Sequence, residues 1–208
     1  MVLPILLLLL VSTASAITFH GSLSTPTGVN GTGVWATDLK VEWWVEQASD
    51  TSWFYKYHYT KLNGSALSKA ISHWYVEVSP NVTRSDFWGF SGSWEFTDVT
   101  HGGTPFENSL KLDYGSDGQT EWSFYSKKAP VWGDFYLKGG KDPSNNNVQL
   151  YAWNAGFFDA DPTSPAADGS INNKILRPDS ITGIPEPATL SLLGLGLLGI
   201  GIRTFRRK

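Results

Sequence analysis

The sequence of 208 residues contains no cysteine. Disulfide bonds are therefore excluded as a source of stability. A packed core must supply that stability, and the 10 Trp, 11 Phe and 8 Tyr provide side chains that bury large apolar areas. A domain of about 150 residues can bury enough surface to fold without cross-links.

Basic residues are scarce in the central part of the chain. Residues 17–185 hold 12 Lys and Arg against 18 Asp and Glu, so their formal charge is −6. Proteins that bind nucleic acid need a basic surface to meet the phosphates. This acidic balance argues against nucleic acid as a partner.

Sustained helical periodicity is also missing from the central part of the chain. Residues 53–60 instead alternate, which places Trp53, Tyr55, Tyr57 and Tyr59 on one face, and this pattern is typical of a half-buried strand. Similar runs occur at 41–47, 71–78, 92–99, 109–114, 120–126, 134–138 and 148–153. We therefore predict an all-β fold, an antiparallel β-sandwich of the jelly-roll or immunoglobulin-like kind, with a β-barrel as the alternative.

The composition changes on both sides of these runs. Residues 17–34 are rich in Gly, Ser and Thr and are expected to form at most one edge strand. Residues 159–187 contain five prolines and few large apolar side chains. We therefore predict a β domain over 17–158, with an autonomous core from about residue 35, and a Pro-rich linker over 159–184 that builds no core.

The first residues have the pattern of a secretory signal peptide. An apolar run is followed by Ala14-Ser15-Ala16, the small-x-small arrangement that signal peptidases cleave. The run is too short for a membrane span, which needs about 20 residues. We predict a signal peptide over 1–16, with Ala14 and Ala16 defining the cleavage site.

The last residues have the pattern of a membrane anchor. Residues 188–202 carry no charge, and Arg203, Arg206, Arg207 and Lys208 follow. A helix of this length spans about 22 Å, and snorkelling of Arg203 brings it closer to the roughly 30 Å hydrocarbon core. Under the positive-inside rule, the basic end stays in the cytoplasm. We therefore predict a C-terminal transmembrane helix that leaves the β domain outside.

A Pro185-Glu186-Pro187 triplet precedes this anchor. The order of triplet, apolar segment and terminal arginine cluster over residues 185–208 resembles the PEP-CTERM sorting signal of Gram-negative bacteria. The resemblance implies that an exosortase, a membrane-embedded protease, cleaves near the triplet. The protein would then be anchored in the inner membrane before processing, and lie at the cell surface or in the extracellular matrix afterwards. The alternative is an ordinary C-terminal anchor that is never removed.

Few residues of the central part indicate catalysis. Ser72 and His73 are neighbours on a predicted strand, so their side chains should point to opposite faces and fail to form a nucleophile–base pair. His73 is expected to be structural. Glu95, Asp98 and Glu121 could supply the two carboxyl groups of a glycoside hydrolase, but nothing distinguishes them from other strand acids. We expect no enzymatic activity and no catalytic residue.

Metal sites are weakly indicated. The four histidines have none of the spacings of a zinc site. The acidic segments 113–118 and 159–161 are rich enough in oxygen to hold calcium, although acidic turns are usually solvated. We predict no cofactor, with calcium as the weaker alternative.

The number of tryptophans exceeds what one core of this size readily hides. We predict that Trp88 and Trp132, both next to a glycine, are exposed and stack on sugar rings. Together with the resemblance, whose members often accompany exopolysaccharide production, this favours a non-enzymatic surface or matrix protein that binds exopolysaccharide. The alternative is a secreted glycan-active hydrolase on the same β domain.

Overall fold

The computed structural model describes residues 16–49, 51–97, 105–113 and 120–179. These residues form antiparallel β-strands and two short 3-10 helices, without an α-helix, as the all-β prediction requires. The strands are β1 (Thr18–Ser24), β2 (Val29–Gly31), β3 (Lys40–Ser49), β4 (Ser52–Thr60), β5 (Ile71–Glu77), β6 (Phe87–Trp88), β7 (Ser93–Thr97), β8 (Ser109–Asp113), β9 (Glu121–Ser126), β10 (Pro130–Gly133), β11 (Phe135–Asp142), β12 (Asn145–Asn154) and β13 (Ile175–Pro178). The 3-10 helices are η1 (Gly33–Ala36) and η2 (Arg84–Asp86).

The eight alternating runs of the sequence correspond to β3, β4, β5, β7, β8, β9, β11 and β12. The edge strand expected within residues 17–34 is β1, which pairs along its length with β3 and forms one edge of its sheet. Four short strands, β2, β6, β10 and β13, were not predicted because none is long enough to show a period of two.

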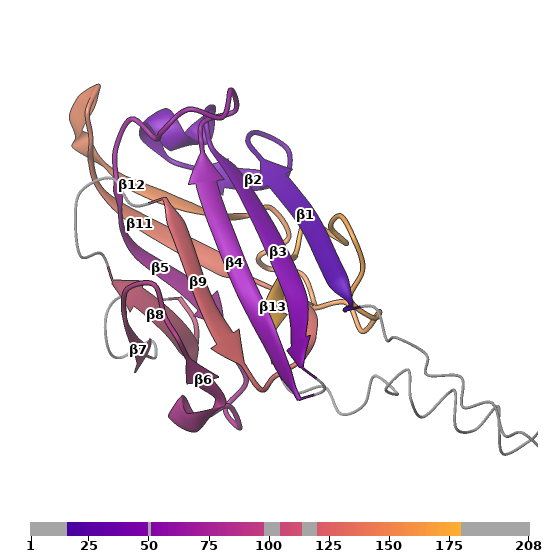
Figure 1. Ribbon diagram of the computed structural model, residues 1–208. Coiled ribbons are helices and arrows are strands. Elements are labelled where there is room, and N and C mark those ends of the chain that lie inside the picture. The colour runs from indigo at the N-terminus through magenta and orange to yellow at the C-terminus, as the bar shows by residue number, and fades with distance from the viewer. Residues whose placement is uncertain (1–15, 50, 98–104, 114–119, 180–208) are drawn as a thin grey trace, which may run out of the picture. The chain divides into compact units, whose positions relative to one another are not determined.

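Five strands form the first sheet, sheet A, in the order β1-β3-β4-β9-β6 (Figure 1). The alternation in β4 works as predicted, because Trp53, Tyr55, Tyr57 and Tyr59 are all buried. The residues between them face outward and are half-buried. Sheet A therefore has one aromatic face toward the core and one mixed face toward solvent.

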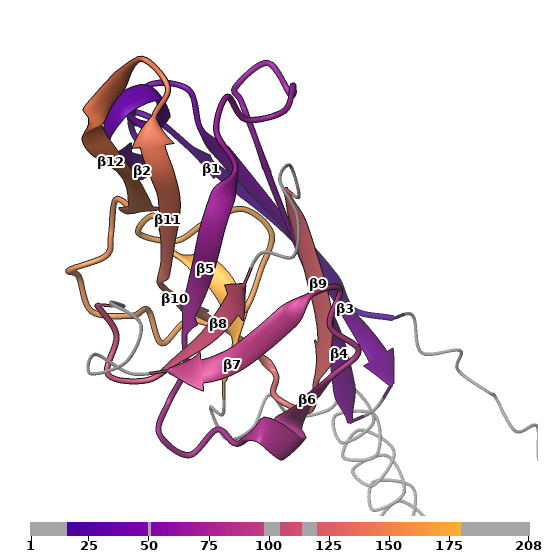
Figure 2. The ribbon, with the colours of Figure 1, turned by 90° about the vertical axis from the view of Figure 1, so that its left-hand side faces the viewer.

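Six strands form the second sheet, sheet B, in the order β2-β12-β11-β5-β8-β7. The strand direction turns strongly from β11 through β5 to β7, as the right-handed twist of strands requires (Figure 2). The β5–β11 pairing contains a register shift, because Lys138 lies opposite His73 whereas Gly139 lies opposite Ile71. Ser72 is thus the extra residue of a β-bulge.

The inner faces of sheets A and B pack against each other through aromatic rings. Ring centroids of Tyr57 on β4 and Trp74 on β5 are 4.5 Å apart, and those of Trp74 and Trp122 on β9 are 5.6 Å apart. Fully burying an aromatic or aliphatic side chain contributes roughly 1.5–3 kcal/mol. This two-sheet core supplies the stability that the missing disulfides would otherwise provide, and it is consistent with a β-sandwich.

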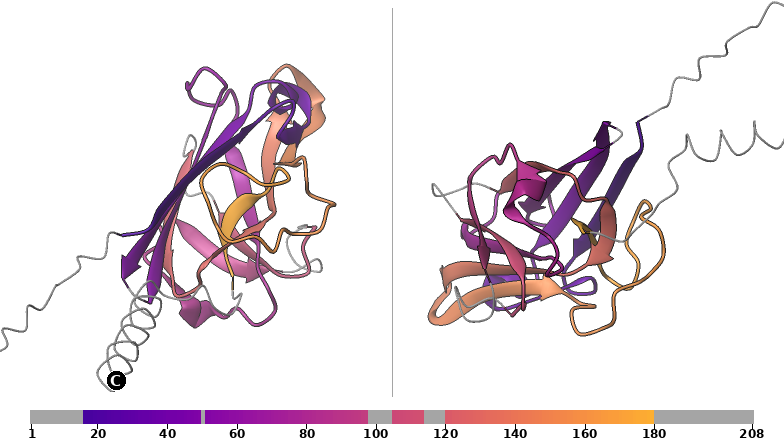
Figure 3. Two further views of the ribbon diagram at one scale, coloured as in Figure 1. Left: turned by 90° about the vertical axis from the view of Figure 1, so that its right-hand side faces the viewer. Right: turned by 90° about the horizontal axis from the view of Figure 1, so that it is seen from below.

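A third, two-stranded sheet corrects the predicted linker over 159–184. Its strand β13 pairs with β10 and lies between the two larger sheets (Figure 3). Ile175 and Leu176 are fully buried, and the Tyr57 hydroxyl donates a hydrogen bond to the Leu176 carbonyl at 2.7 Å. The compact unit extends over Ile17–Thr182 rather than ending at residue 158. The prediction was wrong because proline content hid a short, fully buried strand.

The predicted signal peptide, apart from Ala16, and the predicted anchor lie outside the described residues. Within the described ranges, no helix is long and apolar enough to cross a membrane.

Candidate functional site

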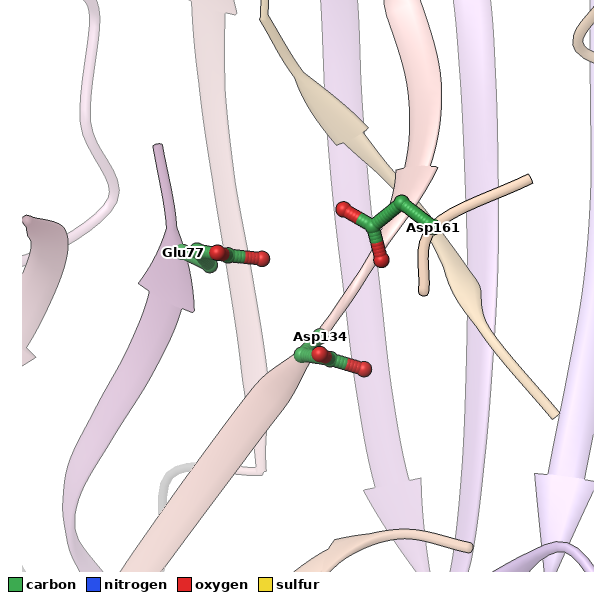
Figure 4. Close-up of side chains that lie close together, drawn as sticks. All are labelled: Glu77, Asp134 and Asp161. Atoms are coloured by element: carbon green, nitrogen blue, oxygen red, sulfur yellow. The ribbon is translucent and has the colours of Figure 1, made fainter. Parts of the chain in front are cut away.

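Three carboxylates converge at one end of the core. Glu77 ends β5, Asp134 lies between β10 and β11, and Asp161 belongs to the segment that leads to β13 (Figure 4). One oxygen atom from each lies within 4.8 Å of the others. Carboxylates this close repel one another unless a cation lies among them.

The chain itself provides that cation in Lys174, whose side chain is 0% exposed. Its Nζ lies 2.8 and 3.0 Å from the two Asp134 oxygens and 2.9 Å from Asp161 Oδ1. The Asp159 carbonyl accepts a further bond at 2.7 Å. In the calcium candidate 159–161, the Asp161 carboxylate and the Asp159 backbone carbonyl therefore bind the Lys174 ammonium group. The calcium candidate 113–118 lies outside the described residues except for Asp113.

Arg177 continues this network on β13. Its Nη2 lies 2.9 Å from Asp161 Oδ2 and 3.4 Å from Glu77 Oε2, and its Nη1 donates to Asp179. Burial raises the pKa of Glu77, against the effect of Arg177. Burial also raises the pKa of Asp134, although Lys174 opposes the shift. Through Glu77 on β5, the network ties β13 to sheet B.

A cleft of about 330 Å³ opens beside the network. Charged and polar groups and the rings of two phenylalanines and two prolines line it: Glu77, Val78, Ser79, Pro80, Pro105, Phe106, Glu107, Asn108, Asp134, Phe157 and Arg177. Its acids outnumber its single arginine, so its wall is acidic.

Ser72 and His73 do contact each other, which corrects the sequence prediction. Ser72 Oγ and His73 Nδ1 are 2.9 Å apart. The β-bulge at Ser72 breaks the alternation that would have separated the two side chains. The Ser72 hydroxyl donates its one proton to the Lys138 carbonyl at 2.8 Å, so Nδ1 of His73 must be the donor to Ser72. This direction is opposite to the one that a general base requires.

The other nitrogen of His73 faces an ion-paired group. Nε2 lies 3.4 Å from Asp113 Oδ1, which also lies 3.1 Å from Lys111 Nζ. Lys111 in turn contacts Glu95 at 2.6 Å. Burial lowers the pKa of His73, although Asp113 opposes the shift. His73 is thus part of a polar row across β5, β8 and β7 on the outer face of sheet B.

The carboxylates considered for glycoside hydrolysis lie on different sheets. Glu95 is on β7 of sheet B and pairs with Lys111, whereas Glu121 is on β9 of sheet A and pairs with Lys56 at 2.8 Å. Asp98 lies outside the described residues. The structure does not bring Glu95 and Glu121 together as a pair across one site.

The two tryptophans predicted to be exposed differ. Trp132 on β10 is 1% exposed, and its indole N–H donates to the Pro165 carbonyl at 3.2 Å. It cannot stack on a ligand, because the segment that was expected to be a linker covers it. Trp88 on β6 is 42% exposed, as predicted.

Trp88 belongs to an aromatic row on the outer face of sheet A. It lies opposite Tyr125 in the β6–β9 pairing, and Tyr125 lies opposite Phe54 in the β9–β4 pairing. The Trp88 and Tyr125 rings are stacked, with centroids 5.8 Å apart, and the Tyr125 and Phe54 centroids are 5.0 Å apart. We call Phe54, Tyr125 and Trp88 the sheet A row.

Gly89 makes room for this row. It has a φ of +66°, and a Cβ at this position would lie 2.9 Å from Cδ2 of Tyr125. A residue with a side chain would therefore strain the backbone and displace the Tyr125 ring.

Sequence reasoning missed Phe54 and Tyr125, although a signal was present. Both lie in runs where alternate residues are buried, so both had to point away from the core. No local signal marked Lys174 or Asp134, because a buried ion pair depends on contacts 40 residues apart in sequence.

The sorting residues Pro185, Glu186, Pro187, Arg203, Arg206 and Arg207 lie outside the described residues. Residues 183–208 match the PEP-CTERM protein-sorting motif, which confirms the resemblance. Comparison with curated proteins and with solved structures found no significant match. The chain therefore carries a PEP-CTERM protein-sorting motif, which supports an exported protein whose membrane-anchored precursor is processed by an exosortase.

Proposed function

We propose that this protein is a non-enzymatic component of the cell surface or extracellular matrix that binds polysaccharide through the sheet A row. The observation that carries the proposal is the exposure of adjacent, stacked rings on an outer sheet face: Trp88 is 42% and Tyr125 36% exposed. The sorting motif supports delivery to the outside, where such a ligand is found.

The groups around the sheet A row favour a sugar ligand. An aromatic face attracts the C–H face of a sugar ring, while polar groups at its rim can bond to hydroxyls. Lys56 is such a group: it lies two residues from Phe54 on the same face of β4, pairs with Glu121, and lies over the Trp44 ring, 5.6 Å from its centroid. The net charge of the body disfavours polyanions, so we propose a neutral polysaccharide.

Affinity electrophoresis tests this proposal. The full chain in mild detergent is run through gels that contain hydroxyethylcellulose, galactomannan or alginate. We expect retardation by a neutral polysaccharide, and about tenfold weaker binding for Trp88→Ala, equivalent to about 1.4 kcal/mol. Trp88→Phe, which keeps a ring, should lose less.

Phe158 provides the matched control, because it is 89% exposed but lies outside the sheet A row. Phe158→Ala should bind like the unmodified chain. Absence of retardation by every polysaccharide, or equal binding by Trp88→Ala, would contradict the proposal.

The second candidate function is a glycan-active hydrolase, for which the contacts of Ser72 with His73 and of His73 with Asp113 bring together suitable residue types. It requires the Ser72 hydroxyl to leave the Lys138 carbonyl and donate to His73 instead. An assay of released reducing ends and of released acetate, run on the same samples, separates the two. Turnover that disappears in Ser72→Ala would support the hydrolase, and retention without turnover supports the binding protein.

A further inference from the structure

A second group of aromatic side chains lies on the outer face of sheet B. Tyr136 on β11 lies opposite Trp153 on β12 and opposite Tyr75 on β5. The Tyr136 ring centroid is 6.0 Å from that of Tyr75 and 5.8 Å from that of Tyr151, with which it is stacked. The rings thus cover three adjacent strands.

The burial pattern shows that these rings point away from the core. Tyr136 lies between the buried Phe135 and Leu137, and Tyr151 and Trp153 flank the buried Ala152. Tyr136, Tyr151 and Trp153 are half-buried, whereas Tyr75 is covered. We call Tyr136, Tyr151 and Trp153 the sheet B face.

The charged groups beside the sheet B face are balanced. Lys111 pairs with both Asp113 and Glu95, and Lys138 lies opposite His73. The four formal charges of Lys111, Lys138, Asp113 and Glu95 therefore cancel. Burial and the neighbouring Tyr151 and Tyr75 raise the pKa of Tyr136 to about 12, so its hydroxyl stays a neutral donor and acceptor.

We infer that the sheet B face is a second polysaccharide site, and that one molecule bridges two polysaccharide chains. The sheets pack through their inner faces, so the sheet A row and the sheet B face lie on opposite sides of the two packed sheets. A single segment of polysaccharide therefore cannot contact both the sheet A row and the sheet B face. This inference rests on the proposed function of the sheet A row.

Charge and chemistry favour a neutral polysaccharide as the occupant of the sheet B face. Its rings carry hydroxyl or N–H groups at their rims, which suits a ligand that alternates C–H and O–H groups. The balanced charges offer no net attraction to a polyanion. A protein partner or a second copy of the chain is an outcome that the test distinguishes.

The test uses a bridging assay with the full chain in mild detergent. Beads are coated with a neutral polysaccharide that the protein bound in the gel experiment. They are loaded with protein, washed, and then incubated with the same polysaccharide in fluorescent, soluble form. Retained fluorescence reports that bound protein holds a second chain. The variants are Tyr151→Ala and Trp153→Ala for the sheet B face, with Phe158→Ala as control and melting curves to verify folding.

We expect the unmodified chain and Phe158→Ala to retain fluorescence. Each sheet B variant should load onto the beads as before but retain at least about fivefold less fluorescence. Undiminished bridging by folded sheet B variants would overturn the inference, and it would indicate bridging by a second copy. Failure of the unmodified chain to load onto any bead contradicts the proposed function itself.

Discussion

Lys174 shows how much of this structure depends on single side chains that a sequence pattern does not reveal. It lies in a segment rich in proline and poor in large apolar residues, yet its ammonium group is enclosed by Asp134, Asp161 and the Asp159 carbonyl. A charged residue in a sequence is normally expected to be exposed to solvent. Only the fold, which brings residue 134 next to residue 174, makes burial of this charge favourable.

Replacing Lys174 should therefore destabilise the body strongly. In Lys174→Met, Asp134 and Asp161 lose their buried cation, and breaking such a pair costs about 3–5 kcal/mol. Chemical denaturation followed by tryptophan fluorescence measures the free energy of unfolding. Lys141→Met is the matched control, because Lys141 is exposed and should change stability by less than about 0.5 kcal/mol. Equal effects of the two variants would show that the network is not stabilising.

Some strands could be predicted from the sequence, and others could not. β3, β4, β9 and β12 have enough residues for alternation to appear, and one sheet face buries every second side chain. β10 and β13 have four residues each, all buried, so neither has a period to detect. The same alternation could have predicted which aromatic side chains lie on the outer faces of the sheets. It could not predict which strands pair, because pairing and register depend on contacts between distant segments.

The buried tyrosines of β4 indicate how the stability of the protein should change at alkaline pH. Burial raises the pKa of Tyr55, Tyr57 and Tyr59 well above the ordinary value. The unfolded chain loses these phenolic protons near pH 10, whereas the folded protein keeps them. Stability from the neutral rings is therefore complete below about pH 10 and falls above it, by up to about 1.4 kcal/mol per pH unit for each ring.

The free energy of unfolding, measured by denaturant titration from about pH 8 to pH 11, checks this expectation. The pKa values of Tyr75 and Tyr136 are raised as well, so Tyr57→Phe should reduce the slope above pH 10 by about one fifth, because one of five such tyrosines is gone. It should also lower stability below pH 10 by about 1 kcal/mol, because the hydrogen bond to the Leu176 carbonyl is lost. A stability that stays constant from pH 9 to pH 11 would show that these rings titrate alike in both states.

In the whole molecule, the sorting motif follows the compact body directly in the sequence. The compact unit extends to Thr182, and the motif match starts at residue 183. Because β13 is part of the core, a cut before residue 174 would remove this buried strand together with Lys174 and Arg177, and a cut within β13 would remove part of it. Processing that preserves the fold must therefore occur beyond Asp179.

Intact-mass spectrometry of the protein recovered from outside producing cells tests the central claim, that an exosortase releases a complete body from its anchor. The account predicts a chain that begins at Ile17, ends between residues 180 and 187, and lacks Arg203, Arg206 and Arg207. Protein found only in the inner membrane and still ending at Lys208 would contradict it.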